Sequence, residues 1–285
     1  MNVVSTIRDV RQHVRDWRRQ GLTVGMVPTM GSLHEGHLAL VDRSRARCGR
    51  TLATIFVNPT QFGPSEDFNA YPRVFDRDVK LLNERGCDLV FAPSVEELFP
   101  DGYQTLEQFR TRVNVHELCD GLCGALRPGH FSAIATQVMK LFMIGQPDFA
   151  FFGEKDYQQL QVVRRMVRDL SVPVEIESIP IVRAPDGLAL SSRNAYLTPE
   201  ERKIAPLLSR VLCSAVRELQ DGGKLPIVTE RARENLIGGG FSSVDYVTLV
   251  DDLLQPLEVA DKPARLLAAA WLGRARLIDN APFPP

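Results

Sequence analysis

Two histidines, His34 and His37, stand three residues apart just after an apolar stretch and a glycine. Side chains with this spacing share one face of a helix, and a helix start offers unpaired backbone N–H groups to phosphate oxygens. Gly36 lowers helix propensity by about 1 kcal/mol relative to alanine, so its place between the histidines indicates that a ligand needs the empty space. The pattern predicts a nucleotide-binding site.

Zinc binding is one alternative for the two imidazoles, and an ordinary surface or core position is another. A catalytic zinc site needs a third protein ligand, and the H-E-x-x-H pattern places its histidines one residue further apart. The remaining histidines, His13, His116 and His130, form no second cluster. The local sequence leaves phosphate binding and its alternatives open, so the rest of the chain must decide between them.

Three other segments carry polar side chains suited to a small acid or to phosphate. Asn58 and Gln61 are amides, which both donate and accept hydrogen bonds. Lys155 offers a positive charge, and Gln159 follows it by one helical turn. The segment 190–194 supplies two hydroxyls and a guanidinium, which can clamp a phosphate. Each segment alone also fits a plain polar turn or a hinge without a ligand.

Strand and helix patterns alternate over the first 180 residues, which is typical of an α/β fold with a Rossmann-like, doubly wound parallel sheet. Ligands of such sheets bind beyond the carboxyl ends of the strands, so the loops after Met30, Val57 and Phe152 are expected to converge. Ser32 followed by Glu35 has capping-box spacing and predicts a helix start at Ser32. The expected strands are Leu22–Met30, Thr51–Val57, Asp88–Ala92 and Phe149–Phe152, and the expected helices include Leu38–Arg47, Val74–Arg85 and Ser132–Ile144.

A second, smaller α+β C-terminal domain is expected after about residue 180, giving domains 1–180 and 181–285. Residues 183–194 form a loop, and Thr198 with Pro199 and Glu201 is a strong signal for a helix that runs to about Leu219. Strands are expected near Val244–Val250 and Ala264–Leu272.

The composition is that of an ordinary globular chain, with 285 residues, 44% hydrophobic residues and a net charge of -1. Basic residues in 8–19 and 43–50 are interspersed with apolar ones at helical spacing, which favours solvated helix faces over a nucleic-acid partner. No export signal and no apolar run near the roughly 20 residues of a membrane span are visible. Five cysteines without a CxxC pair argue against a disulfide framework. We expect a cytoplasmic protein.

The segments His34-Glu35-Gly36-His37 and Leu190-Ser191-Ser192-Arg193 resemble the HIGH and KMSKS-like signatures of a nucleotidyltransferase superfamily. Within it, nearly the whole chain resembles the pantoate–β-alanine ligase family. Thr60 departs from the family pattern, in which Met is expected, while Gln61 is retained. The further matching segments are Tyr71-Pro72-Arg73, Arg127-Pro128-Gly129-His130-Phe131, Gly153-Glu154-Lys155-Asp156 and Ala270-Trp271-Leu272-Gly273.

The resemblance implies a two-step ligation that yields pantothenate. Pantoate and ATP first give pantoyl adenylate and pyrophosphate, and the amine of β-alanine then displaces AMP. The catalytic residues implied are His34, His37, Lys155 and Arg193, with His37 as the assigned proton donor. The ATP site implied consists of Met30, Gly31, Ser32, Leu33, His34, Glu35, Gly36, His37, Gly153, Glu154, Lys155, Asp156, Val182, Leu190, Ser191, Ser192 and Arg193.

The resemblance also implies ligands and partners. Gln61 and Gln159, with Asn58 beside them, are expected to hold pantoate, and Arg127 or Gln61 to contribute to the β-alanine site. Magnesium is expected on the ATP phosphates with few protein ligands, and Asp78 is its candidate outer-shell carboxylate. A homodimer is expected.

Two other functions are also compatible with the sequence. Another adenylyltransferase of the superfamily would share the first motif without needing paired glutamines for a small acid. A catalytically silent nucleotide-binding protein would be expected to have lost one of its four catalytic candidates, and all four are present.

Overall fold

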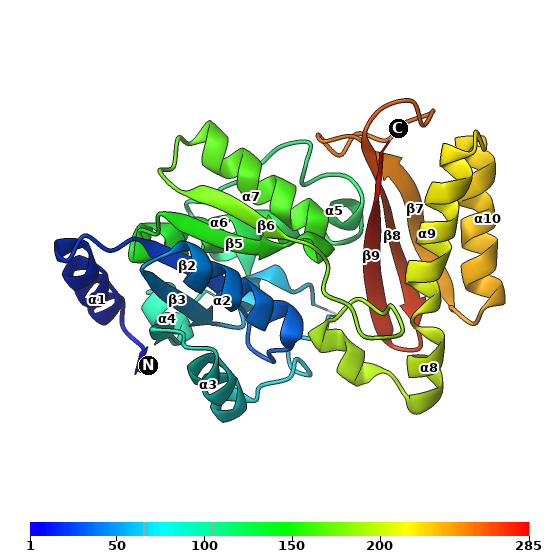
Figure 1. Cartoon of the computed structure of the whole chain (residues 1–285). Coiled ribbons are helices and arrows are strands. Elements are labelled where there is room, and N and C mark those ends of the chain that lie inside the picture. The colour runs from blue at the N-terminus through cyan, green and yellow to red at the C-terminus, as the bar shows by residue number, and fades with distance from the viewer. Residues whose placement is uncertain (65, 104, 285) are drawn as a thin grey trace. The chain divides into compact units, whose positions relative to one another are not determined.

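The computed structural model describes residues 1–64, 66–103 and 105–284 (Figure 1). The chain forms two compact units, one of residues 1–154 and 159–180 and the other of residues 155–158 and 181 onward. Within the described residues, the first unit contains a six-stranded parallel sheet and the second a three-stranded antiparallel sheet. The predicted fold class, a doubly wound α/β unit with a smaller α+β unit, is confirmed.

The parallel sheet of the first unit contains two strands that the sequence patterns did not predict, β1 and β6. Both lie at edges of the sheet, where a strand buries less side-chain surface and its apolar pattern is weaker. The strands are β1 (Asn2–Val4), β2 (Val24–Thr29), β3 (Arg50–Ile55), β4 (Leu89–Phe91), β5 (Phe149–Gly153) and β6 (Glu175–Ile179). The helices are α1 (Ile7–Arg19), α2 (Glu35–Arg47), α3 (Phe75–Glu84), α4 (Val95–Leu98), α5 (Cys123–Leu126), α6 (His130–Gly145) and α7 (Tyr157–Asp169).

The strand order is β1-β4-β3-β2-β5-β6. From β2 the chain proceeds through β3 and β4 toward one edge, whereas β5 and β6 extend toward the other. The order therefore reverses between β2 and β5, which pair through Gly25 with Phe149 and Met26 with Ala150. In doubly wound sheets, ligands bind at the carboxyl ends of the strands that flank this reversal.

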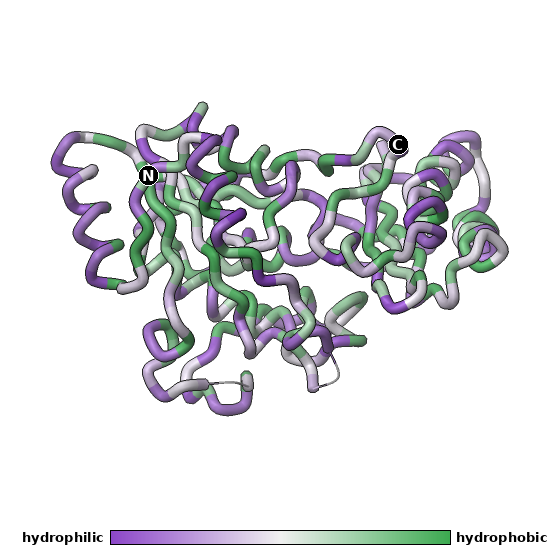
Figure 2. The backbone as a smooth tube through the Cα atoms, turned by 90° about the horizontal axis from the view of Figure 1, so that it is seen from below, coloured by the Kyte–Doolittle hydropathy of each residue, from purple (hydrophilic) through white to green (hydrophobic). Residues whose placement is uncertain are grey.

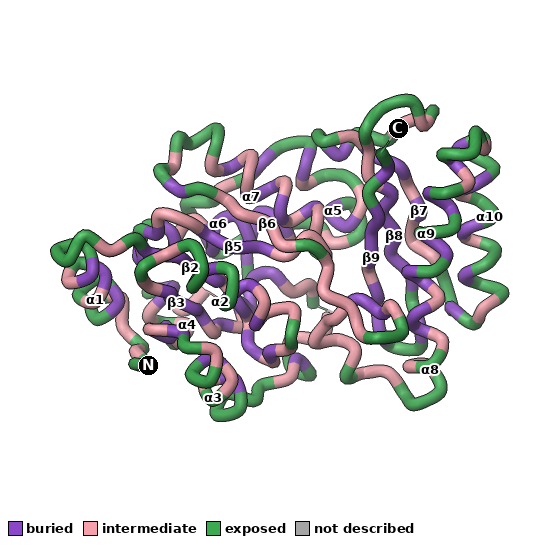
Figure 3. The backbone as a smooth tube through the Cα atoms, viewed as in Figure 1, coloured by how far each residue is buried: buried purple, intermediate pink, exposed green. Residues whose placement is uncertain are grey.

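Helices cover both faces of the parallel sheet (Figure 1). Val27 and Phe151 belong to a buried cluster with Leu40 and Val41 of α2, and Figure 3 shows the central strands buried. On the opposite face, a Cβ added to Gly145 of α6 would lie 2.4 Å from Met26. Neighbouring residues of β2 therefore point to opposite faces, as a strand requires.

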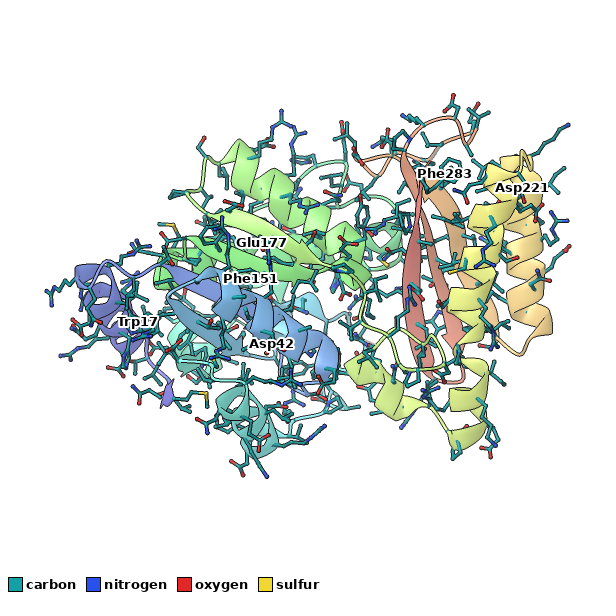
Figure 4. The ribbon with its side chains drawn as sticks, in the orientation of Figure 1. Trp17, Asp42, Phe151, Glu177, Asp221 and Phe283 are labelled. Atoms are coloured by element: carbon teal, nitrogen blue, oxygen red, sulfur yellow. The ribbon has the colours of Figure 1, made fainter. Side chains whose placement is uncertain are left out.

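The edge strand β6 is held from both faces by side-chain contacts. Glu177, which Figure 4 labels, accepts hydrogen bonds from Arg43 and Arg47 of α2 at 2.7 and 3.1 Å. The adjacent Ser178 accepts one from Arg164 of α7 at 3.0 Å. Because adjacent strand residues point to opposite faces, α2 and α7 lie on opposite sides of the sheet.

The second unit packs its two long helices on one antiparallel sheet. Leu212 of α9 and Leu236 of α10 are buried in one cluster with Leu266 and Ala270 of β8. Figure 2 shows the two long helices of this unit with mixed hydrophobic and hydrophilic positions, as one-sided burial of a helix requires. The elements are α8 (Pro199–Ile204), α9 (Leu207–Gln220), α10 (Leu225–Gly238), β7 (Ser243–Val250), β8 (Ala264–Leu272) and β9 (Ala275–Phe283).

The predicted helix from Thr198 to Leu219 is in fact two helices. Its start is confirmed, since Thr198 and Glu201 exchange side-chain to backbone hydrogen bonds at 2.8 and 3.2 Å. The prediction of a continuous helix is wrong because α8 ends before Pro206, which has no N–H to continue the hydrogen-bond ladder.

Two further properties are the hydropathy of the helices and the state of the cysteines. In the part of the chain that the structure describes, no helix has the length and apolar character needed to cross a membrane. The five cysteines all lie in this part as free thiols, and burial raises the pKa of Cys87 to about 11. This thiol is therefore protonated and unreactive at neutral pH.

Candidate active site

The loop that follows β2 turns twice through left-handed backbone conformations before α2 begins. Gly31 has φ of 79° and Ser32 has φ of 51°. A Cβ on Gly31 would lie 2.9 Å from Oδ2 of Asp78. Glycine is required at residue 31 because the conformation and the close neighbour both disfavour a side chain.

The helix α2 begins at Glu35 with His34 as its N-cap, so the predicted start at Ser32 is wrong. The backbone N–H groups of Ser32 and Leu33 donate to the two oxygens of Asp78, at 2.7 and 2.8 Å. These bonds hold the two residues outside the helix. Glu35 does not close a capping box with Ser32 but forms an ion pair with Arg85 at 2.6 Å.

His34 and His37 lie together at the start of α2, with ring centroids 4.1 Å apart. Nδ1 of His34 accepts the N–H of Gly36 at 3.1 Å, and Nδ1 of His37 accepts the N–H of His34 at 3.4 Å. A ring that accepts at Nδ1 carries its proton on Nε2 when neutral. Both rings are therefore in the tautomer that can donate from Nε2 to an anion.

The second predicted segment forms the short 3-10 turn η1 (Pro59–Gln61) after β3. Asn58 caps it, and its side-chain oxygen accepts hydrogen bonds from the N–H and hydroxyl of Thr60 at 3.1 and 2.8 Å. Asn58 is fully buried, and its Nδ2 has no hydrogen-bond partner among the described residues. An unpaired buried donor costs about 1–3 kcal/mol.

Gln61 links this turn to the loop after β2. Its Nε2 donates to Sδ of Met30 at 3.0 Å, and its carbonyl oxygen lies 2.7 Å from Nδ1 of His130. The structure thus brings together a residue predicted to bind nucleotide and one predicted to bind the small acid.

Arg127, predicted to contribute to the β-alanine site, has its guanidinium bound to other side chains. It forms a two-bond ion pair with Glu66 and lies 2.7 Å from Nε2 of His130. Because arginine only donates, Nε2 accepts and the Nδ1–H of His130 donates to the carbonyl of Gln61. The described contacts of Arg127 therefore connect it to Gln61 through His130.

The carboxyl end of β5 leads into the third predicted segment. A Cβ added to Gly153 would meet no atom within 4 Å, so space is open beside this residue. Glu154 accepts a hydrogen bond from the hydroxyl of Ser178 at 3.2 Å. Gln159 is half-buried near the start of α7.

Lys155 belongs to the second unit. Its backbone oxygen accepts a hydrogen bond from Nδ2 of Asn280 in β9 at 3.1 Å. Its Nζ lies 3.6 Å from Oδ1 of Asp156, and its side chain is 18% exposed. Asn280 therefore fixes the peptide that carries this charge, and no pattern in the sequence points to that role.

The fourth predicted segment lies at the beginning of the second unit. The N–H of Leu190 donates to the carbonyl of Val182 at 3.0 Å, so two residues predicted for the ATP site are neighbours. The hydroxyl of Ser191 accepts the N–H of Arg193 at 3.3 Å and caps the 3-10 turn η4 (Ser192–Tyr196). The KMSKS-like residues thus form one ordered turn.

The position of Asp78 on a helix suggests a surface side chain, but in the structure Asp78 is buried. It is 0% exposed, and burial raises the pKa of its carboxyl group, while the hydrogen bonds from Leu33 and Ser32 lower it. Among the residues with described positions, no group of three His, Cys, Asp or Glu side chains could hold a metal. Asp78 therefore belongs to no such group among the described residues.

Comparison with known proteins identifies the family. The family profile for pantoate-beta-alanine ligase matches residues 2–282. A pantothenate synthetase of Paramagnetospirillum magneticum is 50% identical, and the match covers 100% of this chain and 99% of the relative. The chain belongs to the pantoate–β-alanine ligase family. The resemblance and the enzyme class inferred from the sequence are thereby confirmed.

Solved structures of pantoate–β-alanine ligases have the same fold. The pantothenate synthetase of Thermus thermophilus is 48% identical, with a TM-score of 0.90 and complete coverage of both chains. The ligase of Francisella tularensis, 32% identical with a TM-score of 0.82 and coverage of 99% and 97%, was solved in complex with beta-gamma ATP and β-alanine.

Proposed function

We propose that this enzyme joins pantoate to β-alanine in two ATP-dependent steps. A pantoate carboxylate oxygen attacks the α-phosphorus of ATP, the bond to pyrophosphate breaks, and pantoyl adenylate forms. The amine of β-alanine then attacks the acyl carbon, and AMP leaves as pantothenate forms. The mixed anhydride is needed because a free carboxylate is a poor electrophile.

The observation that carries the proposal is the imidazole pair at the start of α2, at the strand-order reversal, in a chain of this family. Nε2–H donors aimed at the α-phosphate oxygens of ATP would stabilise the charge that develops there. We assign the same task to Lys155 and Arg193. The rest of the ATP site is proposed as the resemblance implies it.

Pantoate is assigned to the amides of Asn58, Gln61 and Gln159. Asn58 caps the short turn that contains Gln61, which supports placing the acid at this turn. We expect Arg127 or Gln61 to contribute to the β-alanine site, and the solved Francisella tularensis ligase was complexed with β-alanine.

Magnesium would be held by the β- and γ-phosphates of ATP, because Mg²⁺ keeps most of its waters and takes few protein ligands. No step above depends on a protein-bound metal. A homodimer, which the family resemblance implies, and a cytoplasmic location, which the sequence led us to expect, are part of this proposal.

The order of product release tests the proposal. With ATP, magnesium and pantoate, a single-turnover experiment should release pyrophosphate before β-alanine is added, and AMP only afterwards. A dinucleotide-forming adenylyltransferase would require a phosphorylated acceptor instead of pantoate, and a silent nucleotide-binding protein would release neither product. A requirement for β-alanine before any ATP cleavage would contradict the two-step scheme.

A further inference from the structure

The carboxylate of Asp78 in α3 occupies an anion-binding turn made by the protein's own backbone. Consecutive N–H groups in a left-handed turn point the same way and bind anions. Here the N–H groups of Ser32 and Leu33 each contact one carboxylate oxygen, at 2.7 and 2.8 Å. Asp78 itself is fully buried.

The contact is continuous with the imidazole pair. Leu33, 1% exposed, shares a buried cluster with Leu82 of α3, and His34 follows it directly as the cap of α2. The N–H of His34 donates to Nδ1 of His37. A shift of the backbone at Ser32 and Leu33 would therefore move both rings.

We propose that Asp78 is a positioning residue, whose carboxylate holds the loop before α2 so that the imidazoles of His34 and His37 meet the phosphates of ATP. The inference rests on the proposed ATP site. It differs from the expectation that Asp78 is an outer-shell carboxylate for magnesium, and it rests on the burial of Asp78 and on the backbone hydrogen bond that each of its oxygens accepts. Burial raises the pKa of this carboxyl group, and the hydrogen bonds from Leu33 and Ser32 lower it.

The variant Asp78→Asn tests the proposal, with Asp76→Asn as the matched control. Asp76 lies in the same first turn of α3 and is exposed. Asparagine presents one acceptor oxygen, so one of the two N–H groups faces an amide NH₂. We expect Asp78→Asn to slow pyrophosphate release about 10- to 100-fold at saturating ATP and magnesium, the scale of a small misplacement of reacting groups. The magnesium concentration that gives half of the maximal rate should not change.

A second readout needs no ATP. In protein labelled with ¹⁵N-histidine, the ring signals of His34 and His37 should shift in Asp78→Asn, while that of His13 stays. If the parent protein releases no pyrophosphate, the proposed function fails, yet the ring signals still test the positioning.

Three results would overturn the proposal. One is a parental rate with unshifted ring signals. Another is a rate restored by excess magnesium, which would indicate a metal ligand. The third is failure of both Asp78→Asn and the charged variant Asp78→Glu to fold, which would show that Asp78 serves the fold alone.

Discussion

At the scale of single residues, the direction of a hydrogen bond decides what each candidate can do. His34 and His37 accept backbone N–H groups at Nδ1, so their Nε2 nitrogens carry the protons. His130 has the opposite tautomer, because Arg127 donates to its Nε2. The first pair can donate to a phosphate, whereas His130 donates to the protein backbone.

His37→Ala should lower the rate of pantoyl adenylate formation by about 10²-fold or more, the usual effect of removing an electrostatic stabiliser. Lys155→Ala should have an effect of the same size. His13→Ala is the control, since His13 lies on α1 beside Trp17. Rapid-quench measurement of pyrophosphate gives the rates, and circular dichroism checks the fold. Adenylate formation at the parental rate by a folded variant would remove that residue from the proposed mechanism.

At the scale of elements, the close approach of α2 to the sheet places the histidines at the end of β2. A Cβ on Gly25 of β2 would lie 2.2 Å from Oγ of Ser44 and 2.8 Å from Sγ of Cys48. Ser44 is itself fixed by a 2.8 Å hydrogen bond to Thr51 of β3. The helix can therefore lie this close only because residue 25 has no side chain.

Gly25→Ala should lower the free energy of unfolding by about 1–3 kcal/mol, the usual cost of overpacking a core. Gly121→Ala is the control, because a Cβ there would meet no atom within 4 Å. Urea unfolding followed by circular dichroism measures both values. Equal stabilities of the two variants would show that α2 moves away from the sheet without cost.

At the scale of the whole molecule, each unit has its own buried core, and the ion pairs differ in how far they are buried. Arg183 binds both oxygens of Asp279 at 2.6 and 2.8 Å, and the side chain of Asp279 is 2% exposed. The pair between Arg202 and Asp186, at 2.5 Å, is 39% and 43% exposed. Solvent screens the second pair far more than the first.

Asp279→Asn should lower the free energy of unfolding by about 3 kcal/mol, because it removes the buried negative charge and one of the two oxygens that the guanidinium of Arg183 binds. Asp186→Asn should cost less than about 1 kcal/mol. Hydrogen exchange read by mass spectrometry should show faster exchange in β8 and unchanged exchange in β3 for Asp279→Asn. Equal losses of unfolding free energy in the two variants would show that the difference in burial between the two ion pairs does not affect stability.

The sequence by itself determined the alternation of strands and helices, the cap at Thr198, the family and the segments that carry the candidate site. Each of these is encoded in short runs of residues, where spacing, apolar periodicity and turn chemistry act locally. His34 to His37 and Leu190 to Arg193 could be found for this reason. The start of α2 could not be found in this way, although Ser32 and Glu35 have the spacing of a capping box.

Only the tertiary structure decided the partners of the charged and amide groups. Asp78 meets Ser32 across 46 positions, Arg127 meets Glu66 across 61, and Asn280 meets Lys155 across 125. Such contacts depend on how sheet, helices and loops pack, and a buried carboxylate takes whichever donors the packing brings to it. Ser32 lies in a turn that binds Asp78 and does not cap the helix, because two hydrogen bonds to a buried carboxylate outweigh one local side-chain cap.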